Sequence, residues 1–280
     1  GFPDPHHPFR APEPWGSMFD AADMPGPRGT LEDLADKPPE YMAFMRGRLN
    51  AEHLGAGDYN TRDLTALTDD DIRQIQATTL GMIAFLDHHV GRLLDMLDEF
   101  DLADDTVVGF TSDHGDLMGD HQMILKGPFL LDSLVRVPMV LAGPGISAGM
   151  RSDALCEHVD FLPTALDWAG ADPAPGRDGR SLVDLLAGRT DRHRSRCLVE
   201  YLHQFQFDRN VKPLVTDRWK LVYWGGQGYG ELYDMAADPC ESVNLWHAAE
   251  AADVKRRLLH ELLDELVVSE DILPLPQAPA

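Results

Sequence analysis

A carboxylate and imidazole cluster stands directly after a short apolar run in the middle of the chain. Residues 106–110 are apolar and β-branched, which is typical of a strand buried on both faces. Ser112, Asp113, His114 and Asp116 follow at once. In an open parallel sheet, ligands bind just beyond the carboxyl ends of the strands, so these groups would lie at the mouth of a site. They suit a hard or borderline divalent cation, although an Asp/Gly turn without a metal would use the same residues.

A lysine strengthens the metal interpretation. Lys126 follows Asp113 by thirteen residues and is flanked by Leu125 and Gly127, which is not typical of a solvated helix face. Residues 137–142 form a second apolar run, preceded by Arg136, and predict another buried strand. A cation and an amine near one another are the groups that would hold an oxyanion.

The order of these motifs resembles the sulfatase family of the alkaline-phosphatase-like superfamily. Two C-terminal segments are similar to the family's LYDL…DPxExxNL signature, and a proline-rich N-terminal segment is similar to its PHxPF segment. The likeness runs over nearly the whole chain. The matching segments are SDHGD at 112–116, Lys126, RVPMV-LAGPG at 136–145, LYD at 232–234, DPCESVNL at 238–245 and PHHPF at 5–9.

The resemblance implies roles for four residues. Asp113 and His114 are the expected metal ligands, and Lys126 and His6 are the expected catalytic and substrate-binding groups. By pattern alone a histidine among prolines is usually a solvent-exposed bystander; the resemblance favours His6 and leaves His7 undecided. His121 is a weaker substrate-side candidate, for which a structural role is the alternative. The implied cofactors are Ca²⁺, with Mg²⁺ or Mn²⁺ as alternatives, and a formylglycine nucleophile.

The family's nucleophile has no counterpart in these 280 residues. Formylglycine forms from the cysteine or serine of a C/S-x-P/A-x-R motif, and none of the three cysteines fits it. Residues 147–151 (SAGMR) come nearest but carry glycine at the third position. The family's first strand, with its paired metal aspartates, is also not found. We therefore expect the later part of a sulfatase, with a partial metal site and no turnover of sulfate esters by itself.

The predicted fold is α/β, with a parallel-rich sheet flanked by helices. We expect one domain over 1–190 and a smaller antiparallel α+β subdomain over 191–280. Thr68 and the acidic residues after it predict the start of a long helix over 70–100, whose apolar residues form a core-facing stripe. Loss of the family's first strands would leave an exposed sheet edge or an unpaired apolar face. The other predicted elements are helices near 41–49, 160–166, 180–188 and 254–268 and strands at 197–202, 211–216 and 219–224.

Composition narrows the partners. A formal net charge of −23 argues against a nucleic-acid partner, which would require a basic face, and requires local cations at any anion-binding site. The three cysteines are widely spaced and do not form a disulfide framework, which favours a reducing compartment. No apolar run is long enough to span a membrane.

The expected substrate is a small-molecule or saccharide sulfate ester. A phosphonate monoester or phosphodiester hydrolase of the same superfamily is the second hypothesis, because sulfuryl and phosphoryl sites share the metal and lysine layout. A non-catalytic metal- or glycan-binding relative is the third. A homo-oligomer and completion by a missing N-terminal segment are both open as modes of assembly.

Overall fold

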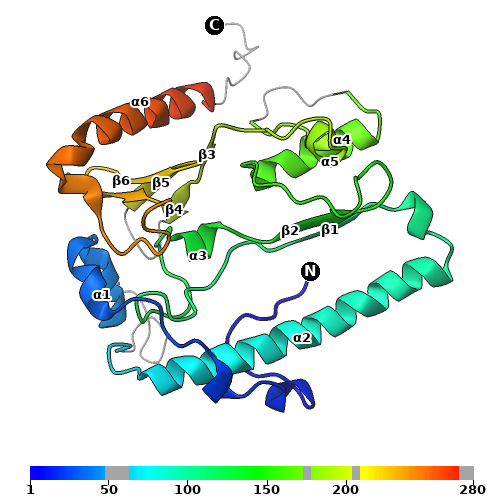
Figure 1. The fold of residues 1–280 in the computed structure, drawn as a ribbon, viewed down its shortest axis with the longest axis horizontal. Coiled ribbons are helices and arrows are strands. Elements are labelled where there is room, and N and C mark those ends of the chain that lie inside the picture. The colour runs from blue at the N-terminus through cyan, green and yellow to red at the C-terminus, as the bar shows by residue number, and fades with distance from the viewer. Residues whose placement is uncertain (48–62, 173–177, 204–208, 271–280) are drawn as a thin grey trace, which may run out of the picture.

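The computed structural model describes residues 1–47, 63–172, 178–203 and 209–270 (Figure 1). Long helix α2 lies along one side of the molecule, strands β1 and β2 lie in the middle, and a C-terminal sheet carries helix α6. The helices are α1 (Pro39–Met45), α2 (Asp69–Glu99), α3 (Asp132–Val135), α4 (Phe161–Trp168), α5 (Val183–Leu186) and α6 (Ala252–Val268). The strands are β1 (Val108–Thr111), β2 (Met139–Ala142), β3 (Arg196–Leu198), β4 (Tyr201–His203), β5 (Arg209–Thr216), β6 (Trp219–Trp224) and β7 (Gly230–Asp234).

The C-terminal sheet is antiparallel throughout, as predicted for this part of the chain. Its order is β3-β5-β6-β7, with β4 also paired to β5. Successive side chains of a strand point to opposite faces. Leu221 packs in a cluster with Leu258 and Leu262 of α6, and the next residue, Val222, packs in a different cluster on the other face. The sheet is therefore covered on both sides.

The second face of this sheet shares its core with the N-terminal part of the chain. Tyr41 and Phe44 of α1 pack in one cluster with Phe129 and with Val222 and Trp224 of β6. The rings of Tyr41 and Phe129 stack at 4.1 Å. This core draws on both sides of residue 190. The division into domains at that residue stays a prediction.

The prediction of a parallel-rich sheet is wrong for the described residues. Strand β1 pairs with β2 in antiparallel register, with Phe110 opposite Val140, and every other pairing between named strands is antiparallel too. The physical reason lies in the connection. Parallel neighbours need a crossover, usually a helix of substantial length. Residues 112–138 are mostly irregular and contain only the four-residue helix α3, so the chain returns antiparallel beside β1.

The β1–β2 pair is also more exposed than predicted. Residues 106–110 were expected to be buried on both faces, yet Phe110 is 38% exposed and Val140, its cross-strand partner, is 60% exposed. On the other face, Met139 and Leu141 of β2 are partly buried, because they pack against Leu182 and its neighbours in α5. The pair is thus partly covered on one face of β2 and exposed elsewhere.

Helix α2 begins where it was predicted and is packed over only part of its length. Thr68 caps the helix as predicted, and with Asp71 it forms a capping box, in which each side chain accepts a hydrogen bond from the backbone of the other residue. Ile72 and Met82 are fully buried. From residue 83 onward no residue of the helix is buried, so the predicted core-facing stripe is only half realised.

No helix in the described part of the chain combines the length and the apolar character needed to cross a membrane.

Candidate active site

The residues after β1 form a tight, internally bonded turn. The backbone N–H of His114 donates to Oδ1 of Asp113 at 2.9 Å, and Oγ of Ser112 donates to the carbonyl oxygen of His114 at 2.8 Å. The N–H of Gly115 donates to the carbonyl oxygen of Leu134 at 2.8 Å. A β-carbon at Gly115 would overlap the carbonyl oxygen of Ser133, so only glycine allows the turn to lie this close to α3.

The hydrogen bonds of His114 determine which ring nitrogen is free. Its Nδ1 atom lies 2.8 Å from the carbonyl oxygen of Gly115. A carbonyl only accepts, so Nδ1 carries the proton and the lone pair of the neutral ring is on Nε2. That Nε2 atom lies 3.5 Å from Oδ2 of Asp113. A histidine ligand commonly has its second nitrogen held by a carbonyl in this way, which leaves Nε2 and the carboxylate together as donors.

Asp113 is kept in its charged form. Burial would raise its pKa, but the hydrogen bond from the backbone of His114 and the nearby imidazole outweigh this and hold the pKa below the ordinary value. The side chain is 84% exposed. A charged, accessible carboxylate is the state that a divalent cation requires.

Four of the chemically relevant side chains line one large hollow of about 3100 Å³. Asp113, His114 and Lys126, all predicted for the site, lie on its wall together with His7. Among the described residues, no carboxylate lies within ion-pair distance of the Lys126 amine. In a chain of net charge −23, an unpaired amine on a site wall is available for an anion.

Asp116 belongs to the loop between these residues. Burial raises its pKa above the ordinary value, against the opposing effect of hydrogen bonds from the backbone of Met118 and Leu125 and of the nearby Lys126 amine. Its Oδ1 atom accepts the backbone N–H of Met118 at 3.0 Å. The side chain therefore holds the loop that carries Lys126 and does not extend the pair formed by Asp113 and His114.

The N-terminal histidines are placed differently from one another. His6 is exposed and is not on the wall of the hollow, whereas His7 lines it. The two rings stack at 4.0 Å, and Nδ1 of His6 lies 2.6 Å from the carbonyl oxygen of His7. The role predicted for His6 stays a prediction, and the placement of His7 makes it the alternative candidate.

His121 does not line the large hollow. It is 1% exposed, and its Nδ1 atom lies 3.2 Å from Oδ2 of Asp33. It lines a separate, smaller cavity with Arg28 and Asp120. Arg28 forms two hydrogen bonds to Asp120, at 2.8 and 2.7 Å. The substrate-binding role predicted for His121 remains untested, and its contacts are those of a residue that joins the loop to the N-terminal segment.

The donors present fit a divalent cation only in part. A carboxylate and an imidazole are suitable ligands, but calcium takes about six to eight oxygen ligands. No group of three or more His, Cys, Asp or Glu side chains in the described part of the chain is placed to hold a metal ion. Among the described residues, Asp113 and His114 therefore make a half-site at most.

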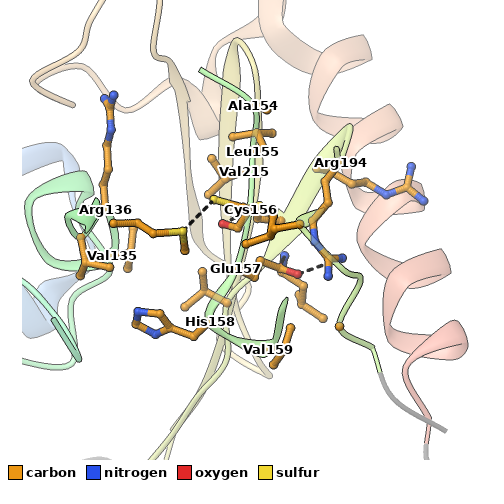
Figure 2. A pocket seen from close by; sticks show the side chains of 18 of the residues that line it. Val135, Arg136, Ala154, Leu155, Cys156, Glu157, His158, Val159, Arg194 and Val215 are labelled. Atoms are coloured by element: carbon orange, nitrogen blue, oxygen red, sulfur yellow. Dashed lines mark hydrogen bonds and ion pairs between the residues drawn. The ribbon is translucent and has the colours of Figure 1, made fainter. Parts of the chain in front are cut away.

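Glu157 and Arg194, which line the hollow, belong to a buried ion-pair cluster that was not predicted from the sequence (Figure 2). Asp160 is fully buried and accepts hydrogen bonds from Arg194 and, at 2.8 Å, from the backbone N–H of Arg180. Arg194 also pairs with Glu157 at 3.0 Å. Only Asp160 carried a sequence signal, as the first residue of a helix. The cluster fixes this wall of the hollow.

The two cysteines on this wall, Cys156 and Cys197, are poor substitutes for the missing nucleophile on chemical grounds. Burial raises the pKa of Cys156, and it raises the pKa of Cys197 to about 12. Thiols of raised pKa carry little thiolate at neutral pH and are poor nucleophiles.

His158 was not predicted for the site from the sequence. It lines the hollow, and its Nε2 atom is 3.3 Å from Oγ1 of Thr111, the last residue of β1.

Comparison with known proteins assigns the family. A profile of the sulfatase family matches residues 2–171, and a profile described as the C-terminal part of N-sulphoglucosamine sulphohydrolase matches residues 119–268. The first match covers more than half of the 280 residues. The chain belongs to the sulfatase family.

The relatives are about twice as long as this chain. The multifunctional alkaline phosphatase superfamily protein PehA of Trinickia caryophylli is 31% identical over 88% of this chain and 50% of its own length. A choline-sulfatase of Rhizobium meliloti is 31% identical over 87% and 45%. The crystal structure of a phosphonate monoester hydrolase of Agrobacterium radiobacter superposes with a TM-score of 0.82 at 29% identity, covering 96% of this chain and 56% of that one. The chain thus spans about half the length of these relatives.

Proposed function

We propose that this chain contributes part of the active centre of a sulfatase-family hydrolase that acts on sulfate monoesters. The observation that carries the proposal is the shared wall of the large hollow, on which the free Nε2 of His114, the charged carboxylate of Asp113 and the amine of Lys126 lie together. Family membership supports the same chemistry. The chain need not hydrolyse an ester by itself to have this function.

Each side chain has a role that its chemistry suits. Asp113 and His114 would supply two ligands to a divalent cation, whose function when bound is to polarise the ester. Lys126 would hold a non-bridging oxygen of the sulfate and neutralise the charge that develops on it. His7 or His6 would donate the proton that the leaving alcohol needs. The turn at Gly115 and the loop bond of Asp116 keep these groups in place.

The first test is the activity of the 280-residue chain with an aryl sulfate. We expect no turnover above the buffer rate, because the sequence contains no C/S-x-P/A-x-R motif to supply the nucleophile. Calorimetric titration with calcium is the companion measurement. We expect binding no tighter than about 1 mM, since only two donors are present. Robust turnover, or tight binding of calcium, would contradict the proposal that this chain holds only part of the centre.

A phosphonate monoester or phosphodiester is the second candidate substrate class. The observation that favours it is the likeness to the Agrobacterium radiobacter phosphonate monoester hydrolase over almost the entire chain. Paired aryl sulfate and aryl phosphonate substrates with the same leaving group separate the two classes once the centre is complete. A higher kcat/KM for the sulfate supports the first candidate, and a higher value for the phosphonate supports the second.

A further inference from the structure

Helix α3 is capped by a residue from the far end of the chain. Its N-cap residue, Leu131, is apolar and makes no side-chain cap hydrogen bond. The backbone N–H of Asp132, the first residue of the helix, instead donates to Oε2 of Glu241 at 2.6 Å. The first N–H groups of a helix have no acceptor within the helix itself. Glu241 therefore supplies, from 109 residues away, the acceptor that the local sequence lacks.

Glu241 is itself fixed from two directions. Its side chain is buried, and its Oε1 atom lies 2.7 Å from Nζ of Lys220 in β6, which is fully buried too. The backbone carbonyl group of Glu241 accepts a hydrogen bond from Nζ of Lys37, in the N-terminal part of the chain. One oxygen of the carboxylate is thus tied to the C-terminal sheet and the other to α3.

The backbone of Glu241 adopts a conformation that its side chain disfavours. Its φ angle is +55°, in the left-handed region that glycine adopts most readily. Residues with a side chain stay in such a region where the surrounding contacts over-determine them, and they cluster at functional sites. A glycine would relieve the strain but would lose the carboxylate. The position therefore combines a strained backbone with a side chain that caps α3.

A continuous series of hydrogen bonds leads from Glu241 to the ring of His114. Helix α3 contains Leu134, whose carbonyl group accepts the backbone N–H of Gly115 at 2.8 Å. The carbonyl oxygen of Gly115 in turn lies 2.8 Å from Nδ1 of His114 and accepts its proton, which leaves the lone pair on Nε2. In Figure 1, α3 stands between the C-terminal sheet and the β1–β2 pair. The helix is therefore the link between Glu241 and the turn.

The turn that α3 holds is exposed. The side chain of Asp113 is 84% exposed and that of His114 is 40% exposed, and Thr111, which leads into the turn, is exposed as well. Segments with few buried contacts open locally at low free-energy cost. The contact with α3 is therefore important for the turn, and a displaced α3 would move the Gly115 carbonyl group that fixes the ring of His114.

We propose that Glu241 is a positioning residue of the half-site formed by Asp113 and His114. Its carboxylate holds α3, and α3 holds the turn that presents Nε2 of His114. Through Lys220, the C-terminal sheet takes part in holding the half-site. The inference rests on the proposed function for the use of that half-site, but the positioning itself can be measured with no metal present.

Two double variants of the 280-residue chain separate the cap from the ion pair. Lys220→Met with Glu241→Gln removes both charges but keeps an amide oxygen that can accept the N–H of Asp132. Lys220→Met with Glu241→Leu removes the charges and the acceptor together. Replacing both partners of a buried ion pair avoids leaving one charge uncompensated, so both double variants are expected to fold.

The measurements are backbone hydrogen exchange at Gly115 and the tautomer of His114 from ¹⁵N NMR. We expect the glutamine double variant to keep the parent values of both. In the leucine double variant, exchange at Gly115 should be about tenfold faster relative to exchange at Leu262 in α6, because the turn opens locally. His114 in that variant should be protonated partly on Nε2, whereas in the parent it is protonated on Nδ1.

The same Gly115 exchange and the same His114 tautomer in the two double variants would overturn the proposal. Equal acceleration at Gly115 and Leu262 would overturn it too, because the cap would then act on global stability alone. If the leucine double variant does not fold, Glu241→Asp takes its place: it keeps the charge but is one methylene shorter, so it cannot hold both partners, and the same changes are expected.

Failure of the proposed function has a different signature. A parent chain that shows the Nδ1–H tautomer of His114 but no broadening by Mn²⁺ at Asp113 and His114 would contradict the metal half-site. The exchange and tautomer results would still decide whether Glu241 positions the turn.

Discussion

The ring of His114 and the carbonyl group of Gly115 are hydrogen-bonded, with 2.8 Å between Nδ1 and the oxygen. This bond places the proton of the neutral ring on Nδ1 and directs the Nε2 lone pair toward the side of Asp113. The turn that holds both groups depends on Gly115, whose backbone passes against Ser133. The chemistry of the half-site therefore depends on a backbone contact made by a residue that has no side chain.

Substitution of this glycine tests the contact. Gly115→Ala should lower the free energy of unfolding by about 1–3 kcal/mol, because the added methyl group overlaps the Ser133 carbonyl and forces the turn away from α3. Urea unfolding followed by circular dichroism measures the change. Gly91→Ala is the control: a β-carbon there meets nothing within 4 Å, and alanine in helix α2 should stabilise the protein by about 0.5–1 kcal/mol. Equal effects of the two variants would refute the close approach at Gly115.

A buried ion pair joins the C-terminal sheet to the site region. Oε1 of Glu241 lies 2.7 Å from Nζ of Lys220, and its Oε2 accepts the backbone N–H of Asp132 at 2.6 Å. Glu241→Gln leaves a charged lysine buried without a counter-ion, so we expect a loss of about 3–5 kcal/mol in the free energy of unfolding. Denaturant titration provides the value. The exposed Glu250→Gln variant should stay within about 0.5 kcal/mol of the parent. A similarly small effect at Glu241 would show that the pair is not desolvated.

The acid stability of the chain should depend on Asp160. Burial would raise its pKa, but the hydrogen bonds from Arg194 and from the backbone outweigh burial and hold the folded-state pKa below 3.8. Its contribution is therefore complete above that pH and is lost as the pH falls through the lowered folded-state pKa. Glu157, whose pKa burial raises, acts in the opposite direction.

Asp160→Asn separates the two carboxylates. We expect the variant to be about 3 kcal/mol less stable at pH 7, because Arg194 loses a buried partner. The difference from the parent should shrink as the pH falls below 4, since Asp160 of the unfolded parent is protonated first and Asp160 of the folded parent only below its lowered pKa. Thermal unfolding between pH 2.5 and 7 measures it. A difference that does not change with pH would mean that Asp160 contributes by packing and not by charge.

The local sequence pattern was sufficient to predict the elements that pack against other described parts of this chain. The helix cap at Thr68, strand β6 and helix α6 follow from periodicity and cap residues, and the structure confirms them. Strand β7 was missed, because its sequence, Gly230-Glu231-Leu232-Tyr233-Asp234, shows no alternation of polar and apolar residues. All five residues are buried in the structure.

Pairing direction and burial could not be predicted in the same way. An apolar strand has the same sequence whether its neighbour is present or not, so residues 106–110 predicted burial that the structure does not show. The direction of β2 depends on the path of residues 112–138, which no periodicity describes. Helix α2 shows the same effect. Its apolar residues have the spacing of a core-facing stripe, but from residue 83 onward none of them is buried.

The candidate site was predicted where one motif contains its members. Asp113 and His114 are adjacent, and Lys126 follows on the same loop. The placement of His7 on the hollow wall, with His6 outside it, depends on ring directions in a proline-rich segment and has no sequence signal. Glu241 lies within the recognised DPCESVNL segment, but its contact with Asp132 spans 109 residues and could not be inferred from spacing.

The central claim is that Asp113, His114, Lys126 and His7 open onto one site, and titration of the 280-residue chain with Mn²⁺ followed by NMR tests it most directly. We predict that the paramagnetic ion broadens the signals of Asp113 and His114 first, that those of Lys126 and His7 broaden with them, and that a double variant, Asp113→Asn with His114→Gln, loses all four effects. Broadening at residues 113 and 114 that leaves 126 and 7 unaffected would contradict the account. So would equal broadening of the acidic first turn of α2, Asp69 to Asp71, because the ion would then be following surface charge alone.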